Sequence, residues 1–340
     1  MNKFVKRGCT VLLALTLALG MSVSAFAADE PTVKKDYQRT NPGTTSPEET
    51  FKFTVTADSM TEAYDENGNL LTKKDMPALT IDPAHYAGGG AGSENEVQNL
   101  TIRHTAPFPN VGVYTYTVKE TKGNTAGVTY YEKPMKLVVT VAHGDGDALD
   151  ETYAFYPDAS NATTATKGAA IENTYSADSL TVTKEVKGGF GDKNQDFNFE
   201  VEFVAPEGQK VNSTITVQGN GTDYTIIPSD WITDGTDGLS RACASFSLKA
   251  GQSVTLGNVP YGVTYTVTED NYTDQGYDAT YDENQNGTIN AATVSTTVIN
   301  NKPATVVTGV ILHSAPYILL LVGVGAAAVA FLILKKHREV

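Results

Sequence analysis

The chain has 340 residues, a formal net charge of −14 and two cysteines. This length is enough for two ordinary domains. Such acidity disfavours binding to nucleic-acid phosphates. The sequence has no phosphate-binding loop, zinc-ligand cluster or nucleophile motif of a hydrolase. We therefore expect no nucleic-acid partner, no cofactor and no metal.

Residues 1–27 are typical of a secretory signal peptide. Basic residues precede an apolar run at 11–19, and Ala25-Phe26-Ala27 provides a small-x-small cleavage site. Removal of this segment leaves Cys243 as the remaining cysteine, which excludes an internal disulfide. The mature protein must therefore gain its stability in another way.

The C-terminal part, 305–340, contains a second targeting element. Residues 315–334 carry no charge, and a run of about 20 apolar residues spans a bilayer. A basic tail with Lys335, Lys336 and Arg338 follows directly, as the positive-inside rule predicts for a cytoplasmic end. We expect an exported chain that is held in the membrane by its C-terminus.

Between these segments, apolar and polar residues alternate with a period of two. Phe51, Phe53 and Val55 show this pattern, and residues 197–203 show it more strongly. Turn signals such as Asn67-Gly68 separate the predicted strands. The sequence therefore predicts an all-β protein with two tandem Ig-like β-sandwich domains, at 28–175 and 178–302.

Each predicted domain contains a matched set of polar residues on core-facing positions. A lysine on the first strand, Lys35 or Lys184, shares the parity of the apolar residues before it. A tyrosine-rich strand ends in a glutamate 85 positions later in both units. Each unit closes on an asparagine two positions after an isoleucine. The predicted triplets are Lys35, Glu120 and Asn173 in the first unit, and Lys184, Glu269 and Asn301 in the second.

These residue types permit an intramolecular reaction. A desolvated, neutral lysine amine can attack an asparagine amide and release ammonia, which leaves an isopeptide bond. A buried, protonated glutamate can polarise the amide and move the protons. The alternative interpretation is structural, with a strand-end ion pair and an asparagine turn cap. Repetition at equal spacing in a disulfide-free exported chain favours the reaction.

The sequence resembles the Gram-positive major (backbone) pilins of the FctA type from about Pro31 onward. The stretches LTVTKEVKG, DFNFEVEF, YGVTYTVTEDNY and INNK occur in the family's order in the second unit. The resemblance implies Ig-like, collagen-adhesin-B-type domains with internal Lys–Asn isopeptide bonds. It implies that Lys35 bonds Asn173 with Glu120 as catalyst, and that Lys184 bonds Asn301 with Glu269.

The resemblance also implies how subunits are joined. Thr305-Val306-Val307-Thr308-Gly309 is similar to a sortase sorting signal, with cleavage expected between Thr308 and Gly309. Related pilins have proline where this chain has Val307. In the family, the acceptor lysine lies shortly before the bonding asparagine, which points to Lys167. A solvated surface lysine is the alternative for Lys167, and a plain membrane anchor is the alternative for the Thr-Gly pair.

Two functions follow from these features. The first is a structural subunit of a sortase-assembled pilus on the surface of a Gram-positive bacterium. Its partners would be sortase, further copies of itself in a covalent polymer, tip and base pilins, and the membrane before sorting. The alternative is a monomeric wall-anchored adhesin that binds a host or partner-cell ligand. Neither is an enzyme with turnover, since each isopeptide bond would form once.

Overall fold

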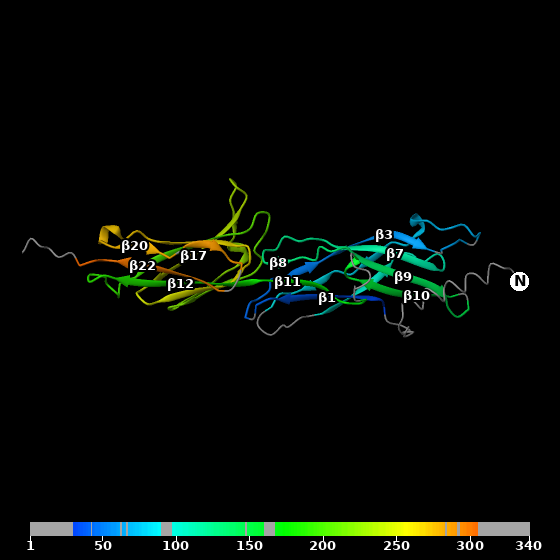
Figure 1. Cartoon of the computed structure of the whole chain (residues 1–340), viewed down its shortest axis with the longest axis horizontal. Coiled ribbons are helices and arrows are strands. Elements are labelled where there is room, and N and C mark those ends of the chain that lie inside the picture. The colour runs from blue at the N-terminus through cyan, green and yellow to red at the C-terminus, as the bar shows by residue number, and fades with distance from the viewer. Residues whose placement is uncertain are drawn as a thin grey trace, which may run out of the picture. The chain divides into compact units, whose positions relative to one another are not determined.

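The computed structural model describes residues 30–304, except 42, 62, 66, 90–96, 147, 160–166, 283 and 291–292. The described chain forms two compact units that meet in sequence between Tyr175 and Ser176 (Figure 1). The second unit also includes two short segments from earlier in the chain, Asn41–Thr45 and Asn124–Gly127. The prediction of an all-β, Ig-like fold is confirmed.

The first unit is a sandwich of two sheets. One sheet has the strand order β4-β6-β1-β11-β8, the other has the order β10-β9-β7-β3, and β2 pairs with β5 in a separate ribbon. The strands are β1 Thr32–Arg39, β2 Glu49–Phe51, β3 Phe53–Thr61, β4 Leu79–Ile81, β5 Ala84–Tyr86, β6 Gln98–His104, β7 Gly112–Glu120, β8 Val128–Thr129, β9 Met135–His143, β10 Leu149–Tyr156 and β11 Ile171–Tyr175, with a 3₁₀ turn, η1, at Lys73–Asp75.

The second unit repeats the two-sheet plan. Its sheets have the orders β15-β14-β18-β12-β22-β20 and β16-β17-β13-β19-β21. The strands are β12 Ala177–Lys187, β13 Phe197–Val204, β14 Ile215–Gly219, β15 Thr222–Ile226, β16 Ile232–Thr233, β17 Ser240–Leu248, β18 Ser253–Pro260, β19 Thr264–Glu269, β20 Asp278–Tyr281, β21 Asn286–Thr288 and β22 Val294–Asn301, with 3₁₀ turns η3 at Pro228–Asp230 and η4 at Thr273–Gln275.

Alternation along the strands builds each core. In β13, for example, Phe197, Phe199, Val201 and Phe203 are buried, while the residues between them face outward. A pleated strand places successive side chains on opposite faces, so one row of large apolar side chains fills the space between the sheets. The cores therefore follow directly from the period-two pattern of the sequence.

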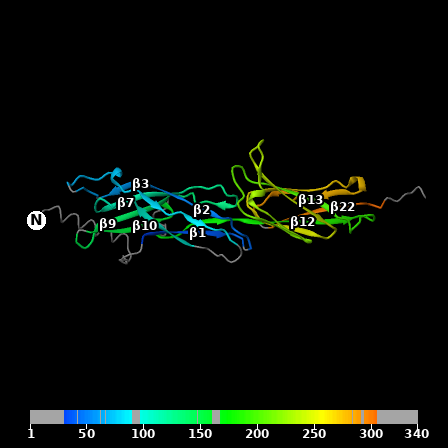
Figure 2. The ribbon, with the colours of Figure 1, turned by 180° about the vertical axis from the view of Figure 1, so that it is seen from behind.

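The first and last strands of each unit are parallel neighbours in one sheet. β1 pairs with β11, with Lys35 opposite Ile171, and β12 pairs with β22, with Lys184 opposite Val298. β12 and β22 lie side by side in both views (Figures 1 and 2). This pairing brings residues from the two ends of a domain sequence into direct contact.

The expected targeting elements lie outside the described residues. These are the signal peptide at 1–27 and the sorting signal at 305–340, with its apolar segment at 315–334. Within residues 30–304, as far as they are described, no helix is long and apolar enough to cross a membrane.

Candidate functional site: two buried Lys–Glu–Asn triplets

The first triplet lies between the two sheets of the first unit. Lys35 is on β1, Asn173 is on the neighbouring β11, and Glu120 reaches across from the end of β7. The Lys35 Nζ is 3.6 Å from the Glu120 Oε2, and both side chains are fully buried. The Asn173 Nδ2 donates a hydrogen bond to the Glu120 Oε1. The structure therefore brings all three predicted residues together.

Backbone carbonyls and aromatic rings hold Lys35 in place. Its ammonium donates to the carbonyls of Asp36 and Ile171 at 3.1 and 3.2 Å, and it lies 4.3 Å from the centre of the Phe51 ring. The Tyr86 hydroxyl donates to the Lys35 carbonyl at 2.8 Å. Lys34, the neighbouring residue, is exposed, as the alternation predicted.

The second triplet has the same plan in the second unit. Lys184 on β12 is fully buried, and its Nζ lies 3.0 Å from the Glu269 Oε1, which comes from β19 in the facing sheet. The Lys184 Nζ donates to the Val298 carbonyl at 3.3 Å and lies 4.6 Å from the centre of the Phe197 ring. Phe197 thus covers Lys184 as Phe51 covers Lys35.

The buried asparagine near Lys184 and Glu269 is Asn300, and the prediction that Asn301 faces the core was wrong. Asn300 is fully buried, and its side chain opposes the rise in the pKa of Glu269. Asn301, by contrast, is exposed. Asn300 lies opposite Val186, two positions beyond the Lys184–Val298 pair. Asn173 stands in the same relation to Lys35, since it lies two positions beyond Ile171. The two triplets are therefore equivalent only with Asn300.

The error came from assigning Ile299 to the core. Ile299 is only half-buried, and the inward row of β22 contains Thr296, Val298 and Asn300. Buried Thr296 is tolerated because its hydroxyl donates to the Asp282 carboxylate at 2.8 Å. A shift of one position moves a side chain to the other face of a strand. The sequence did contain a signal for Asn300, because Val294 and Val298 are apolar and lie on the same face of the strand as Asn300.

Burial shifts both partners of each triplet toward their neutral forms. Desolvation lowers the pKa of the Lys35 amine from 10.5 to about 8, although Glu120 opposes this shift. Desolvation also raises the pKa of the Glu120 carboxyl, with Lys35 acting in the opposite direction. Burial likewise lowers the pKa of Lys184 and raises that of Glu269. A neutral amine beside a protonated carboxyl is the pair that amide attack requires.

The geometry of the first triplet suits the exchange of one amide for another. Attack by the Lys35 amine on the amide carbon of Asn173 forms a C–N bond and breaks the bond to Nδ2, which leaves as ammonia. The leaving nitrogen already contacts Glu120, so the carboxyl can pass it the proton that the lysine loses. The Asn173 amide oxygen has no hydrogen-bond partner among the described residues. Enforced proximity of this kind accelerates an otherwise very slow reaction.

The residues predicted to join subunits are placed differently. Lys167 is exposed, and the N–H of Gly168 beside it donates to the Phe155 carbonyl of the edge strand β10 at 2.9 Å. Its exposure fits both an acceptor amine and an ordinary surface lysine. Thr308 and Gly309 lie outside the described residues.

In the described part of the chain, no group of three acidic, histidine or cysteine side chains could hold a metal ion.

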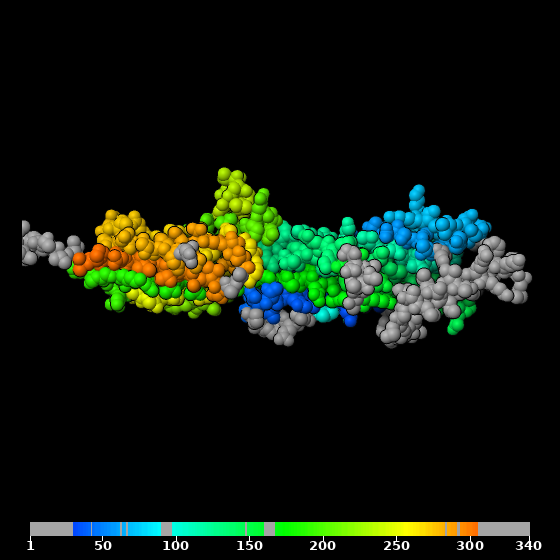
Figure 3. All heavy atoms as spheres, in the orientation of Figure 1, coloured from blue at the N-terminus to red at the C-terminus, as the bar shows by residue number. Residues whose placement is uncertain are grey.

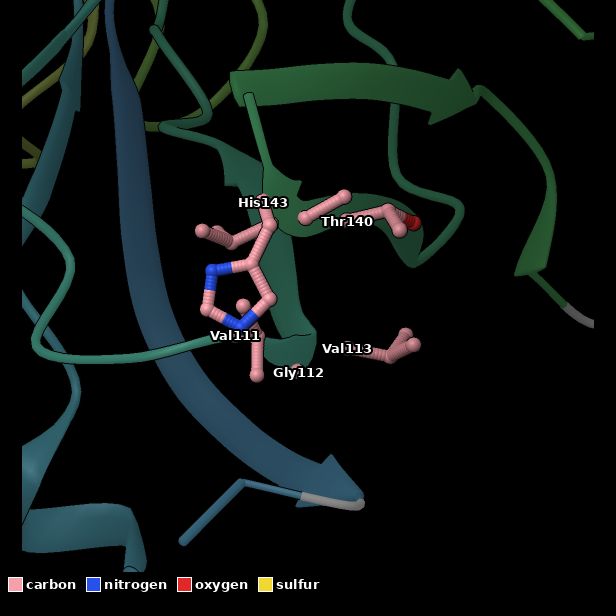
Figure 4. A pocket seen from close by; sticks show the side chains of 7 residues that line it. Val111, Gly112, Val113, Thr140 and His143 are labelled. Atoms are coloured by element: carbon pink, nitrogen blue, oxygen red, sulfur yellow. The ribbon is translucent and has the colours of Figure 1, made fainter. Parts of the chain in front are cut away.

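A hollow of about 250 Å³ lies on the first unit between β7 and β9. It is lined by Val111–Val113 and Thr140–His143, and the His143 ring is turned toward Val111 (Figure 4). Gly112 and Glu120 are the two ends of β7, which are about 27 Å apart in an extended strand. The hollow therefore has no part in the chemistry of the triplet.

Two segments of the chain match known domain families. Residues 31–176 match the FctA family, described as a Spy0128-like isopeptide containing domain, and residues 178–302 match a domain of unknown function, DUF7601. A pilin of Streptococcus pyogenes serotype M1 is 27% identical, and the match covers 92% of this chain and 96% of that pilin. The chain is related to the Gram-positive major pilins.

Solved structures of major pilins share the fold of this chain. The T3.2 major pilin of Streptococcus pyogenes matches with a TM-score of 0.51 at 20% identity, covering 81% of this chain and 99% of that structure. Another Streptococcus pyogenes major pilin matches with a TM-score of 0.51 at 22% identity, covering 82% of this chain and all of that structure. The pilus tip adhesin Cpa of Streptococcus pyogenes is 33% identical over 90 residues, which cover 26% of this chain and 11% of Cpa.

The placement of Asn300 in the second triplet predicts that substitutions of two adjacent asparagines have different effects on ammonia loss. Asn300→Ala removes the amide beside Lys184 and Glu269, so the purified chain should lose one ammonia fewer than the wild type in an intact-mass measurement. Asn301→Ala, on the exposed face, is the matched control and should leave the wild-type mass deficit unchanged. The reverse pattern would contradict the assignment of Asn300.

The pKa shifts predict a narrow pH range for the reaction of the first triplet. The reactive pair holds one proton, on Glu120, while Lys35 is neutral. Acid adds a second proton to the pair and blocks the amine, and alkali removes the proton from the carboxyl. The alkaline decline should begin near the lowered Lys35 pKa of about 8, well below the ordinary 10.5.

This profile can be measured on chain recovered unfolded from inclusion bodies and diluted into buffers of different pH. Ammonia loss is followed by intact mass, in an Asn300→Ala background that isolates the first triplet. A rate that keeps rising up to pH 10 would show that no protonated carboxyl takes part.

Proposed function

We propose that this protein is the structural subunit of a pilus on a Gram-positive bacterial surface, with one Lys–Asn isopeptide bond in each domain. One observation carries the proposal: two equivalent, fully buried Lys–Glu–Asn triplets occur in a relative of the major pilins. The bonds would be Lys35–Asn173 and Lys184–Asn300. The chemistry is intramolecular and occurs once per domain, so the role is structural rather than enzymatic.

The bonds would supply the stability that this chain cannot obtain from disulfides. Cys243 is free and exposed. Each bond would tie the first strand of a domain to its last, and the Lys35 ammonium already contacts a carbonyl 136 residues away in sequence. By the loop-entropy relation for cross-links, a closure of this length stabilises the folded state by about 5 kcal/mol. That is a large share of the total stability of an ordinary domain.

Polymerisation would use groups that lie apart from the triplets. Sortase would cleave between Thr308 and Gly309 and transfer the Thr308 carbonyl to the amine of Lys167 in the next copy. The exposure of Lys167 supports this role, since the enzyme must reach the amine. The matches to a pilin and to the tip adhesin Cpa support a fibre that also carries other pilins. Before sorting, the C-terminal apolar segment would hold the precursor in the membrane.

Co-expression with the cognate sortase tests polymerisation. The wild-type chain should give a ladder of species that resist boiling in SDS, and Lys167→Arg should abolish it while preserving the charge. Lys133→Arg, at another exposed lysine of the same unit, is the control and should leave the ladder intact. A ladder that persists in Lys167→Arg would assign the acceptor to another lysine. Wall-anchored monomer without any ladder would favour the adhesin alternative.

The second bond should carry tension. If a subunit is pulled between Lys167 and Thr308, force entering β12 can pass through Lys184–Asn300 to the exit without separating strands. Single-molecule extension of the wild type between these points should therefore show no unfolding of the second domain. Asn300→Ala should restore an unfolding step and lower the melting temperature. A wild-type step that releases more than a hundred residues would refute the load-bearing role.

A further inference from the structure

The chain leaves the second unit through a set of close contacts that we call the exit clamp. It consists of Lys302, the loop Lys187–Asp192 after β12, and Tyr277. The Lys302 N–H donates to the Lys187 carbonyl at 3.0 Å, and the Phe190 N–H donates to the Lys302 carbonyl at 3.2 Å. Figure 3 shows the orange end of β22 beside the green segment that follows β12. The clamp thus fixes the backbone just beyond β22.

Glycine makes this close approach possible. Gly188 has a φ of +85°, and a Cβ added there would lie 2.2 Å from the Lys302 carbonyl oxygen. A Cβ on Gly191 would lie 2.7 Å from the Lys187 carbonyl oxygen. A side chain at Gly188 would push the loop away from the exit strand, and one at Gly191 would clash with Lys187 and Val186 and so disrupt the turn within the loop.

The side chain of Lys302 adds a third point of attachment. Its ammonium lies 4.9 Å from the centre of the Tyr277 ring, and the Tyr277 hydroxyl accepts the N–H of Asp192 at 2.9 Å. Tyr277 also packs edge-on against Phe197, which covers the ammonium of Lys184. The clamp is therefore packed directly onto the core around the second triplet.

The clamp presents one large apolar side chain to solvent at the chain exit. Phe190 is 58% exposed, although its own N–H is tied to the exit strand. A Cβ on the adjacent Gly189 would lie 3.2 Å from the Ala304 Cβ, so the loop lies against the chain beyond Lys302. Four residue steps separate Ala304 from Thr308, which is at most about 14 Å of extended chain. Whatever is joined to Thr308 is held within reach of Phe190.

We propose that Phe190 and the exit clamp form the donor side of the junction between subunits, on which the next copy of this chain seats the surface around its acceptor lysine. The inference rests on the proposed function, because the covalent link through Thr308 supplies the tether. A short tether gives an effective concentration in the millimolar range or above. The tether thus raises the occupancy of an aromatic contact that is too weak to hold two free molecules together.

The length of chain between the clamp and the link favours a second copy over the processing enzyme as the occupant. The enzyme needs the peptide around Thr308 in an accessible form for a single reaction. The next subunit stays attached through the same few residues for the life of the fibre. A fixed exit and an aromatic residue whose backbone is bonded to that exit would restrict the bending of the junction.

A photo-reactive phenylalanine analogue at position 190 tests the contact within the assembled polymer. Irradiation should cross-link residue 190 to a first-domain peptide of the next copy, identified by mass spectrometry, and should give no such product in unpolymerised chain. The same analogue at position 232 is the control, because Ile232 is 73% exposed but belongs to a different strand, β16. Polymer without a cross-link from position 190 to the next copy would overturn the proposal.

The variant Phe190→Ser separates the possible occupants, with Ile232→Ser as its control. Release of the Thr308 acyl group to hydroxylamine by sortase should be unchanged. The 303–308 segment within the polymer should be cut by a broad-specificity protease roughly tenfold faster, since the buried aromatic contact is lost. Impaired hydroxylamine release with unchanged cleavage would assign Phe190 to the enzyme and refute the proposal. A wild-type chain that forms no polymer at all would refute both this proposal and the proposed function.

Discussion

A lysine ammonium enclosed between two β-sheets determines how each domain of this protein is built. Removing a charge from water is costly unless it is paired or neutralised. Lys35 and Lys184 are both fully buried, and each faces one carboxyl from the opposite sheet. The same desolvation acts on the carboxyl and raises its pKa. Desolvation therefore shifts both groups toward their neutral forms, and the energetic cost of burial helps to produce the unprotonated amine that attack requires.

The strand order makes this arrangement possible. Parallel pairing of the first and last strands brings a lysine and an asparagine together from opposite ends of the domain sequence. Antiparallel neighbours joined by tight turns could not do this, because residues close in space would then be close in sequence. A covalent bond at this place would close almost the whole domain into one loop. Membership of the all-β class does not by itself bring the lysine and the asparagine together, because their closeness depends on which two strands are neighbours.

The two triplets share a plan but differ in the surroundings of the glutamate. Glu120 accepts the Tyr131 N–H at 3.2 Å as well as the Asn173 amide. At Glu269, the Lys184 Nζ lies 3.0 Å from Oε1, and neither carboxyl oxygen has a hydrogen-bond partner among the described residues. A backbone donor stabilises the ionised form of a carboxyl. Glu120 is thus less strongly biased toward protonation by its hydrogen bonds than Glu269.

The sequence by itself determined the strands, the two-domain organisation and most of the triplets. Period-two alternation assigns Lys35, Lys184, Glu120 and Glu269 to the core because side chains of one parity share a face of a strand. It assigned Asn301 rather than Asn300 to the core, because an inward threonine and a half-buried isoleucine blur the alternation in β22. Only the tertiary structure decided this, through the register of β22 on β12. The exit clamp was likewise invisible in the sequence, since it joins a loop, a strand end and a tyrosine that are far apart along the chain.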